Sequence, residues 1–266
     1  MKLDPNLIQS VLRELSQGHR QSPVVIEVVD QTGSTNMDLM VRAKDGLLTA
    51  PVLLLAEEQT AGRGRSGRSW HSIPGGVLTF SLAWHFETGP QSLLGLPLVV
   101  GIAIAERLLQ IGVPVSLKWP NDILKDGKKL GGILLESQSD GLVGAWAVIG
   151  IGLNLQIPTS LEQVIGQEVA DAPWLAQMDR NDLMAQLLQS LMAALEEFKV
   201  LGFTAFVERW NVLHAHAHQA VKIIDQGKLL HQGIALGVDA QGSLVLQTEV
   251  GMLRIHSGDV SLRPLP

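Results

Sequence analysis

Residues 115–155 read VSLKWPNDILKDGKKLGGILLESQSDGLVGAWAVIGIGLNL and contain short apolar runs separated by turn residues. The runs predict strands at Val115–Trp119, Leu130–Glu136 and Ala145–Leu155, because each is short and is bounded by Gly, Asp or Pro. Turns as short as these join antiparallel neighbours. This part of the chain is therefore predicted to form a sheet whose strands are connected mainly by hairpins.

Further helices and strands are predicted on both sides of this segment. Apolar residues at helical spacing indicate a short amphipathic helix from Leu3 to Leu15, with Gly18 as its stop signal. The other predicted helices are Thr35–Lys44, Leu93–Gln110, Leu183–Phe198 and Phe203–Leu213, and the other predicted strands are Val24–Val29, Val52–Ala56 and Val77–Trp84.

The pattern changes after about residue 216, where only short β-runs remain. These runs are Val221–Ile224, Leu229–Val238, Leu244–Leu246 and Met252–Ile255, and glycine-containing turns separate them. A run of strands of this kind predicts a small separate β-barrel or sandwich. We therefore expect two domains, residues 1–216 and residues 217–266.

Composition excludes several classes of function. The 266 residues include no cysteine, which rules out zinc-thiolate sites, iron–sulfur clusters and cysteine nucleophiles and fits a reducing compartment. The net charge of −6 argues against a protein that binds nucleic acid by general phosphate attraction. The apolar stretches 93–105 and 143–155 are too short to span a bilayer and are interpreted as buried core. We expect a soluble cytoplasmic protein with no membrane or nucleic-acid partner.

Hydrophobic periodicity disappears between Gln59 and Pro74, where glycine and arginine alternate in the order Gly62-Arg63-Gly64-Arg65-Ser66-Gly67-Arg68. The segment matches the dinucleotide fingerprint GxGxxG, but the residues after it cannot begin the helix that such a site requires. Glycines let backbone amides approach an anion, and arginines offer planar forks for carboxylate or phosphate. The segment is therefore either an anion-binding loop or a solvated surface loop.

Three other segments could hold a ligand, and each has a simpler structural interpretation. Ser34-Thr35-Asn36-Met37-Asp38 is suited to a polar ligand group, or to a helix N-cap with Asp38 as the capping-box acid. Segment 118–122, KWPND, is followed by segment 128–136, KKLGGILLE. The two glycines of the second segment indicate a bulge or a close approach of the backbone to a ligand. The simpler interpretation is that the two segments form a plain hairpin. Segment 150–155, GIGLNL, offers glycines on which a ring could pack.

Three alternating histidines, His214, His216 and His218, lie in the connection between the two expected domains. No acid or cysteine accompanies them, so we do not expect a metal site there. No GxSxG elbow and no HExxH pair occurs in the sequence.

Taken together and in this order, STN, QTAGRGRSGR, KWPND, KKLGGILLE and GIGLNL, followed by a small β-domain, closely resemble biotin protein ligase. The resemblance runs from about Val24 to Arg263. It implies an α+β fold with a mixed sheet, a catalytic domain related to class II aminoacyl-tRNA synthetases and an SH3-like C-terminal domain. It also implies ATP-dependent activation of biotin to biotinyl-5′-AMP, followed by transfer of biotin to a lysine of a biotin carboxyl carrier protein.

The resemblance also implies roles for individual residues. Lys129, Arg63 and Lys118 would be catalytic, because cations must offset the repulsion between carboxylate and phosphate. Asp122 would assist Mg²⁺. The implied biotin-binding residues are Ser34, Thr35, Asn36, Gln59, Arg63, Gly64, Arg65, Lys129, Gly131 and Gly132, and the implied ATP- or adenylate-binding residues are Arg65, Trp70, Lys118, Asn121 and Asn154.

Two related functions are alternatives to biotin ligation. A lipoate or octanoate ligase of the related fold would use the same adenylation chemistry. The glycine- and arginine-rich segment Gly62–Arg68, the arginine loop, together with KWPND favours biotin. Some members of the family are also biotin-responsive repressors with an N-terminal helix-turn-helix. Only 33 residues precede Ser34 here, so we expect a short form without that unit. The family commonly forms dimers through sheet edges, which makes a homodimer possible.

Overall fold

The computed structural model describes residues 2–16, 23–141, 143–158, 169–225, 227–256 and 260–264, and Gly18 lies outside them. A seven-stranded sheet has the order β1-β2-β3-β7-β6-β5-β4, and a five-stranded antiparallel sheet has the order β11-β10-β9-β8-β12. In the larger sheet β1 pairs with β2 in parallel and the other pairs are antiparallel. The expected α+β class with a mixed sheet is confirmed.

The bounds of the strands agree closely with the sequence pattern. The larger sheet contains β1 (Val25–Thr32), β2 (Val52–Gln59), β3 (Val77–Phe86), β4 (Ser116–Lys118), β5 (Asp122–Lys125), β6 (Lys128–Ser139) and β7 (Ala145–Asn154). The smaller sheet contains β8 (Ala220–Asp225), β9 (Lys228–Val238), β10 (Leu244–Thr248), β11 (Gly251–Ile255) and β12 (Val260–Pro264).

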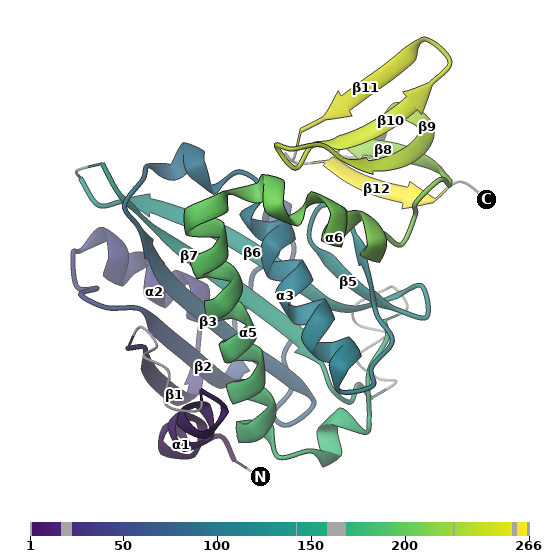
Figure 1. Ribbon diagram of the computed structural model, residues 1–266. Helices are drawn as coiled ribbons and strands as arrows, with labels where there is room; N and C mark the ends of the chain where they lie inside the picture. Colours follow the sequence, from purple (N-terminus) through teal and green to yellow (C-terminus); the bar gives the residue numbers. More distant parts are fainter. Residues whose placement is uncertain are drawn as a thin grey trace.

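Helices cover both faces of the larger sheet. They are α1 (Pro5–Leu15), α2 (Thr35–Lys44), α3 (Leu96–Gln110), α5 (Arg180–Leu201) and α6 (Val207–Leu213), with short 3₁₀ turns at Arg65–Gly67, Pro90–Leu93, Leu175–Gln177 and Phe203–Phe206. On the face seen in Figure 1, α5 packs between α1 and α3. Side chains alternate across a strand, so Ile149 packs toward α3 and α5 while Val148 packs against α2 on the opposite face.

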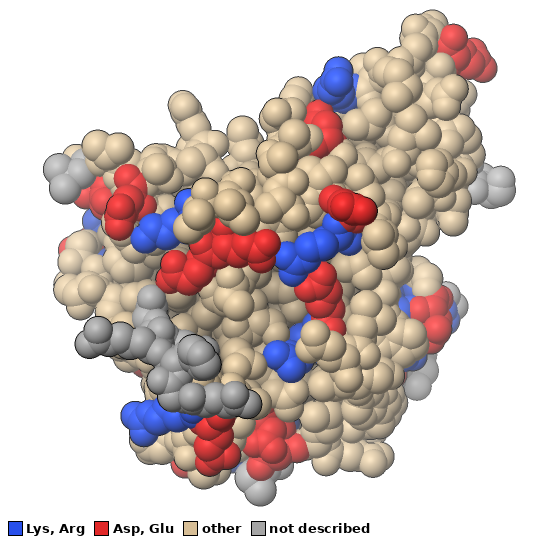
Figure 2. All heavy atoms as spheres, viewed as in Figure 1, with Lys and Arg blue, Asp and Glu red and all other residues tan. Residues whose placement is uncertain are grey.

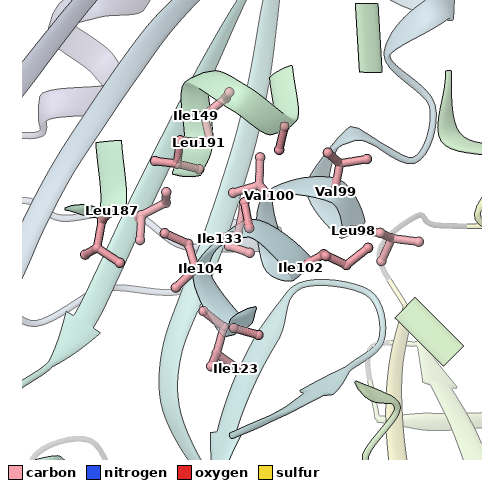
Figure 3. Close-up of a cluster of buried hydrophobic side chains, with 14 of the residues drawn as sticks. Leu98, Val99, Val100, Ile102, Ile104, Ile123, Ile133, Ile149, Leu187 and Leu191 are labelled. Atoms are coloured by element: carbon pink, nitrogen blue, oxygen red, sulfur yellow. The ribbon is translucent and has the colours of Figure 1, made fainter. Parts of the chain in front are cut away.

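The core between α3, α5 and the sheet is built from aliphatic side chains (Figure 3). Val100 and Ile104 of α3 lie beside Ile133 of β6 and Leu187 of α5, and all are buried. By length and composition, Pro90–Gln110 could cross a membrane, but α3 is largely buried in this core. The interpretation of this apolar stretch as core is confirmed.

The second apolar stretch, 143–155, is core from Ala145 onward, but Val143 is 75% exposed at the turn before β7. Two strands were not predicted. β5 has only four residues, two of them charged, and it exists because it pairs with β4 and β6. β12 returns to pair with β8. Neither pairing partner can be recognised from the local pattern.

Hydrogen bonds of α6 and of the residue after β4 join the larger sheet's part of the chain to the smaller sheet. Trp119 Nε1 donates to Gly242 O over 3.1 Å, and Val238 N donates to Asn211 Oδ1 over 2.8 Å. In Figure 1 the smaller sheet lies at the end of the larger one, beside α6. On the face shown in Figure 2, basic and acidic side chains lie next to one another. Among the ion pairs of the described residues, Arg209 pairs with both Glu106 and Glu197.

Candidate active site

A cavity of about 580 Å³ lies on the α2 face of the larger sheet. Its walls come from the start of α2, the arginine loop, the middle of β6 and β7, and the end of β12. Of the site residues predicted from the sequence, all but Gly131 line it: Ser34, Thr35, Asn36, Gln59, Arg63, Gly64, Arg65, Trp70, Lys118, Asn121, Asp122, Lys129, Gly132 and Asn154. Segments far apart in the sequence therefore meet in one pocket.

Gly131 faces away from the cavity. A Cβ at this position would lie 2.9 Å from Gly152 O and 3.3 Å from Leu153 Cδ1, so the glycine serves strand packing. The expected bulge is present beside it, because the β5–β6 register shifts between Ile123 and Leu124. Gly132 instead lies under the cavity, where a Cβ would lie 3.0 Å from Lys129 Nζ.

The start of α2 presents neutral polar groups to the cavity. Ser34 caps the helix and accepts from Met37 N at 3.4 Å. Thr35 donates from its backbone N to Gln59 Oε1 at 2.8 Å, and its hydroxyl lies 2.8 Å from Ser81 Oγ. The predicted capping box is wrong, because Asp38 lies one position too far along the helix and accepts from Thr32 Oγ1 at 2.6 Å.

The arginine loop is folded back on itself over the cavity. Trp70 N donates to Gly62 O at 2.8 Å, and Gly64 N donates to Arg68 O at 2.7 Å. The 3₁₀ turn Arg65–Gly67 is followed by extended backbone, which agrees with the rejection of a dinucleotide-binding helix. Arg65 donates to Oδ1 of Asn121, the residue just before β5, at 3.1 Å.

The indole ring of Trp70 lies over the glycines of the central strands. A Cβ on Gly152 would overlap this ring, and one on Gly132 would lie 3.4 Å from it. Lys129 Nζ is 5.6 Å from the ring centroid, within the range of a cation–π contact. The ring that packs on Gly152 of β7 is therefore supplied by the protein itself, whereas Gly150 of the same strand lies beside Asn36.

Asp122, Lys129 and Lys118 form a cluster of charges in the cavity wall. Asp122 Oδ1 lies 2.6 Å from Lys129 Nζ, and Asp122 Oδ2 lies 3.6 Å from Lys118 Nζ. Burial on its own would raise the pKa of Asp122, but the charges of Lys129 and Lys118 outweigh it, so this pKa is lowered. Burial lowers the pKa of Lys118, and the charge of Asp122 only partly offsets this effect.

The predicted magnesium role of Asp122 does not fit this arrangement, because both of its oxygens face lysine ammonium groups. Among the described residues no group of three acidic or histidine side chains is arranged to hold a metal ion. Magnesium bound to ATP takes ligands from phosphates and water and needs few from the protein. The side-chain amide of Asn154, a predicted nucleotide-binding residue, is engaged within the protein, since its Nδ2 donates to Ala170 O at 3.0 Å.

Several residues that line the cavity were not assigned a role from the sequence. Ser81 and Thr79 lie inside an otherwise apolar strand, and this interruption is a signal that could have identified them. Glu136 is not itself a lining residue, but it accepts from two residues that are, Arg63 at 2.6 Å and Asn36 at 2.7 Å. Arg263 comes from β12, whose position depends on the tertiary fold, so no local signal marks it.

Within the described part of the chain, three buried polar atoms of the cavity wall have no hydrogen-bond partner: Asn36 Oδ1, Thr79 Oγ1 and Trp70 Nε1. Buried polar groups are nearly always satisfied, so unsatisfied ones that gather in a pocket indicate that a ligand completes them. Ring nitrogens of His214 and His216 are also buried without a partner among the described residues, but these histidines do not line the cavity. The His214 ring is tilted against the Trp210 ring at 4.6 Å between centroids, and the His216 ring lies beside it. His214 and His216 therefore belong to the core, whereas His218 is exposed.

Comparison with known proteins agrees with this geometry. Residues 28–154 match the Biotin/lipoate A/B protein ligase family, and residues 218–263 match the Biotin protein ligase C terminal domain. The Bifunctional ligase/repressor BirA of Escherichia coli is 36% identical over 262 residues, covering 96% of this chain and 77% of the relative. The Biotin--[acetyl-CoA-carboxylase] ligase of Mycobacterium tuberculosis is 33% identical and covers 97% of both chains.

Among solved structures, biotin protein ligase from Aquifex aeolicus in complex with biotin and ATP superimposes with a TM-score of 0.76. It is 30% identical in sequence, and the match covers 91% of this chain and 99% of that one. Sequence, fold and cavity agree, and the chain belongs to the biotin protein ligase family.

Proposed function

We propose that the chain is an ATP-dependent biotin protein ligase that forms biotinyl-5′-AMP and transfers biotin to a lysine of a carboxylase's biotin carboxyl carrier protein. The observation that carries this proposal is the distribution of polarity in the cavity. Among the described residues, the unpartnered neutral atoms Asn36 Oδ1 of α2 and Thr79 Oγ1 of β3 face the same cavity as the cations Lys118, Lys129 and Arg263. An acid with a neutral polar ring at one end and a carboxylate at the other matches this distribution.

In the first step a carboxylate oxygen attacks the α-phosphorus of ATP, and the bond to pyrophosphate breaks. Both reactants are anionic, so positive groups placed at the reacting atoms lower the barrier. Lys129 is suited to the carboxylate because it already pairs with Asp122, and the substrate can take over as its partner. Lys118 and Arg263 face the same region and are assigned to the phosphates.

In the second step the acceptor amine attacks the carbonyl carbon of the mixed anhydride and loses a proton, and AMP leaves. This transfer proceeds through a phosphate anhydride and needs no thiol, which suits a chain without cysteine. Residues 1–216 would form the catalytic domain. Residues 217–266 would form the SH3-like domain, which adds Arg263 to the site.

Other assignments follow from the family. A homodimer would use an outer strand of the larger sheet as described, such as β1, where Val25 is 48% exposed. The absence of cysteine supports a cytoplasmic location.

Acid-dependent exchange of pyrophosphate into ATP tests the proposed activity. Biotin, lipoate and octanoate are each offered to the purified protein with ATP and magnesium. We expect exchange with biotin only, because neither other acid carries a ring with N–H groups to complete Asn36 Oδ1 of α2. Exchange with lipoate or octanoate at the rate seen with biotin, or no exchange with any acid, would reject the proposal.

A further inference from the structure

Glu136 links three parts of the site that are distant in the sequence. It lies near the end of β6, on the α2 face, where its side chain is 25% exposed. Oε1 accepts from the guanidinium of Arg63 in the arginine loop at 2.6 Å. Oε2 accepts from the side-chain amide of Asn36 in the first turn of α2 at 2.7 Å. Each carboxylate oxygen therefore has its own donor.

These two contacts fix the orientation of the Asn36 amide. A carboxylate accepts hydrogen bonds and cannot donate them, so the NH₂ group of Asn36 must point to Glu136. The amide oxygen then points the other way, toward β7, where a Cβ on Gly150 would lie 2.8 Å from it. This oxygen is buried and has no hydrogen-bond partner among the residues that the structure describes. Glu136 thus determines that Asn36 offers the cavity an acceptor.

We propose that Glu136 is a positioning residue that sets ligand specificity by holding Asn36 as an acceptor for a ring N–H donor. The inference rests on the proposed biotin-ligase function. A ligand that lacks an N–H at this end would leave the buried oxygen unsatisfied, which disfavours binding. Lipoate and octanoate are such ligands. Arg63 completes the arrangement because it occupies the other oxygen of Glu136.

The replacement Glu136→Gln has a distinctive consequence. Gln has one oxygen and one NH₂ in place of two oxygens. Arg63 can only donate, so it takes the oxygen, and the NH₂ group of Gln then faces Asn36. To avoid opposing two donors, the Asn36 amide must turn over and present its NH₂ to the cavity. Glu136→Met has no polar atoms and leaves Asn36 able to adopt either orientation.

The test measures biotin binding by calorimetry without ATP, in the full-length protein. We expect Glu136→Gln to weaken binding by about tenfold or more and Glu136→Met by about threefold. A purely structural role predicts the reverse order, because Gln is isosteric with Glu. In an Asn36→Ala background the difference between Gln and Met should fall below about twofold. In turnover assays the loss should appear in the KM for biotin and not in kcat.

Glu27→Gln is the matched control. Glu27 of β1 pairs at 2.8 Å with Arg42 of α2, the helix that carries Asn36, and neither residue lines the cavity. The control replacement should leave biotin affinity within about twofold of the wild type. Thermal unfolding of each variant monitors folding. The inference alone would be overturned if Glu136→Gln bound biotin as tightly as the wild type, or if Glu136→Met bound it more weakly than Glu136→Gln. It would also be overturned if the difference between these two variants stayed the same in the Asn36→Ala background. Failure of the wild type to bind biotin would instead overturn the proposed function, and the inference with it.

Discussion

Lys129→Met separates the catalytic from the structural role of the charge cluster. Lys129 and Asp122 are 2.6 Å apart, and their side chains are 27% and 18% exposed. Removing one partner of a fully buried ion pair costs about 3–5 kcal/mol. Here solvent reaches both groups, and Lys118 remains 3.6 Å from Asp122. We therefore expect a loss of about 1–2 kcal/mol and a fall in Tm of roughly 2–8 °C, so the variant folds.

The effect on adenylation should be much larger than the effect on stability. Loss of one preorganised group that stabilises developing charge lowers rates by about 10²–10³-fold, and we expect a decrease of this order in biotin-dependent pyrophosphate exchange. Lys125→Met is the control, because Lys125 pairs with the exposed Asp126 on the same hairpin. Wild-type exchange by Lys129→Met would refute the catalytic role. A change in Tm no larger than that of the control would refute the structural role.

Three further predictions concern other parts of the molecule. Trypsin should cut the 62–70 loop in the ligand-free protein and not with biotin plus ATP, and equal cleavage would show that the loop does not close over ligand. Arg263→Ala should raise the KM for ATP about tenfold without changing biotin binding. The control is Arg254→Ala, which should change neither, because Arg254 lies in the same small sheet but pairs with Asp239. A normal KM for ATP in Arg263→Ala would contradict the role of β12. Burial lowers the pKa of His214 from 6.5 to about 4, so its contribution to stability is complete above pH 6.5 and falls by about 3 kcal/mol as the pH drops toward 4. Denaturant titrations should show that His214→Leu loses this part of the pH dependence, and an unchanged slope would refute it.

The sequence predicted most of the fold because its strongest signals are local. Periodicity placed the helices and the long strands, and glycine-rich turns separated the strands of the smaller sheet. β5 and β12 could not be predicted in this way, since each is a short strand that owes its existence to a partner distant in the sequence. The same reason accounts for Arg263, which reaches the cavity only through the pairing of β12 with β8.

For the site as well, the residues marked by local sequence signals could be predicted, and those placed by the tertiary fold could not. Segments with unusual composition, such as the arginine loop and the lysines of the β4–β6 hairpins, led to residues that do line one cavity. Their partners could not be predicted. Asp122 was expected to meet a metal and instead bridges two lysines, and Glu136 had no predicted role until the fold placed it between Arg63 and Asn36. Residue types indicate the chemistry, but only tertiary structure shows which charges neutralise one another.

Transfer of biotin to a purified biotin carboxyl carrier domain tests the central claim most directly. The protein is incubated with the carrier domain, ATP, magnesium and an equimolar mixture of biotin, lipoate and octanoate, and the mass of the carrier is measured. We predict a single mass increase equal to one biotinyl group, located on one lysine and absent without ATP. An unmodified carrier, or one that gains a lipoyl or octanoyl group, would contradict the account.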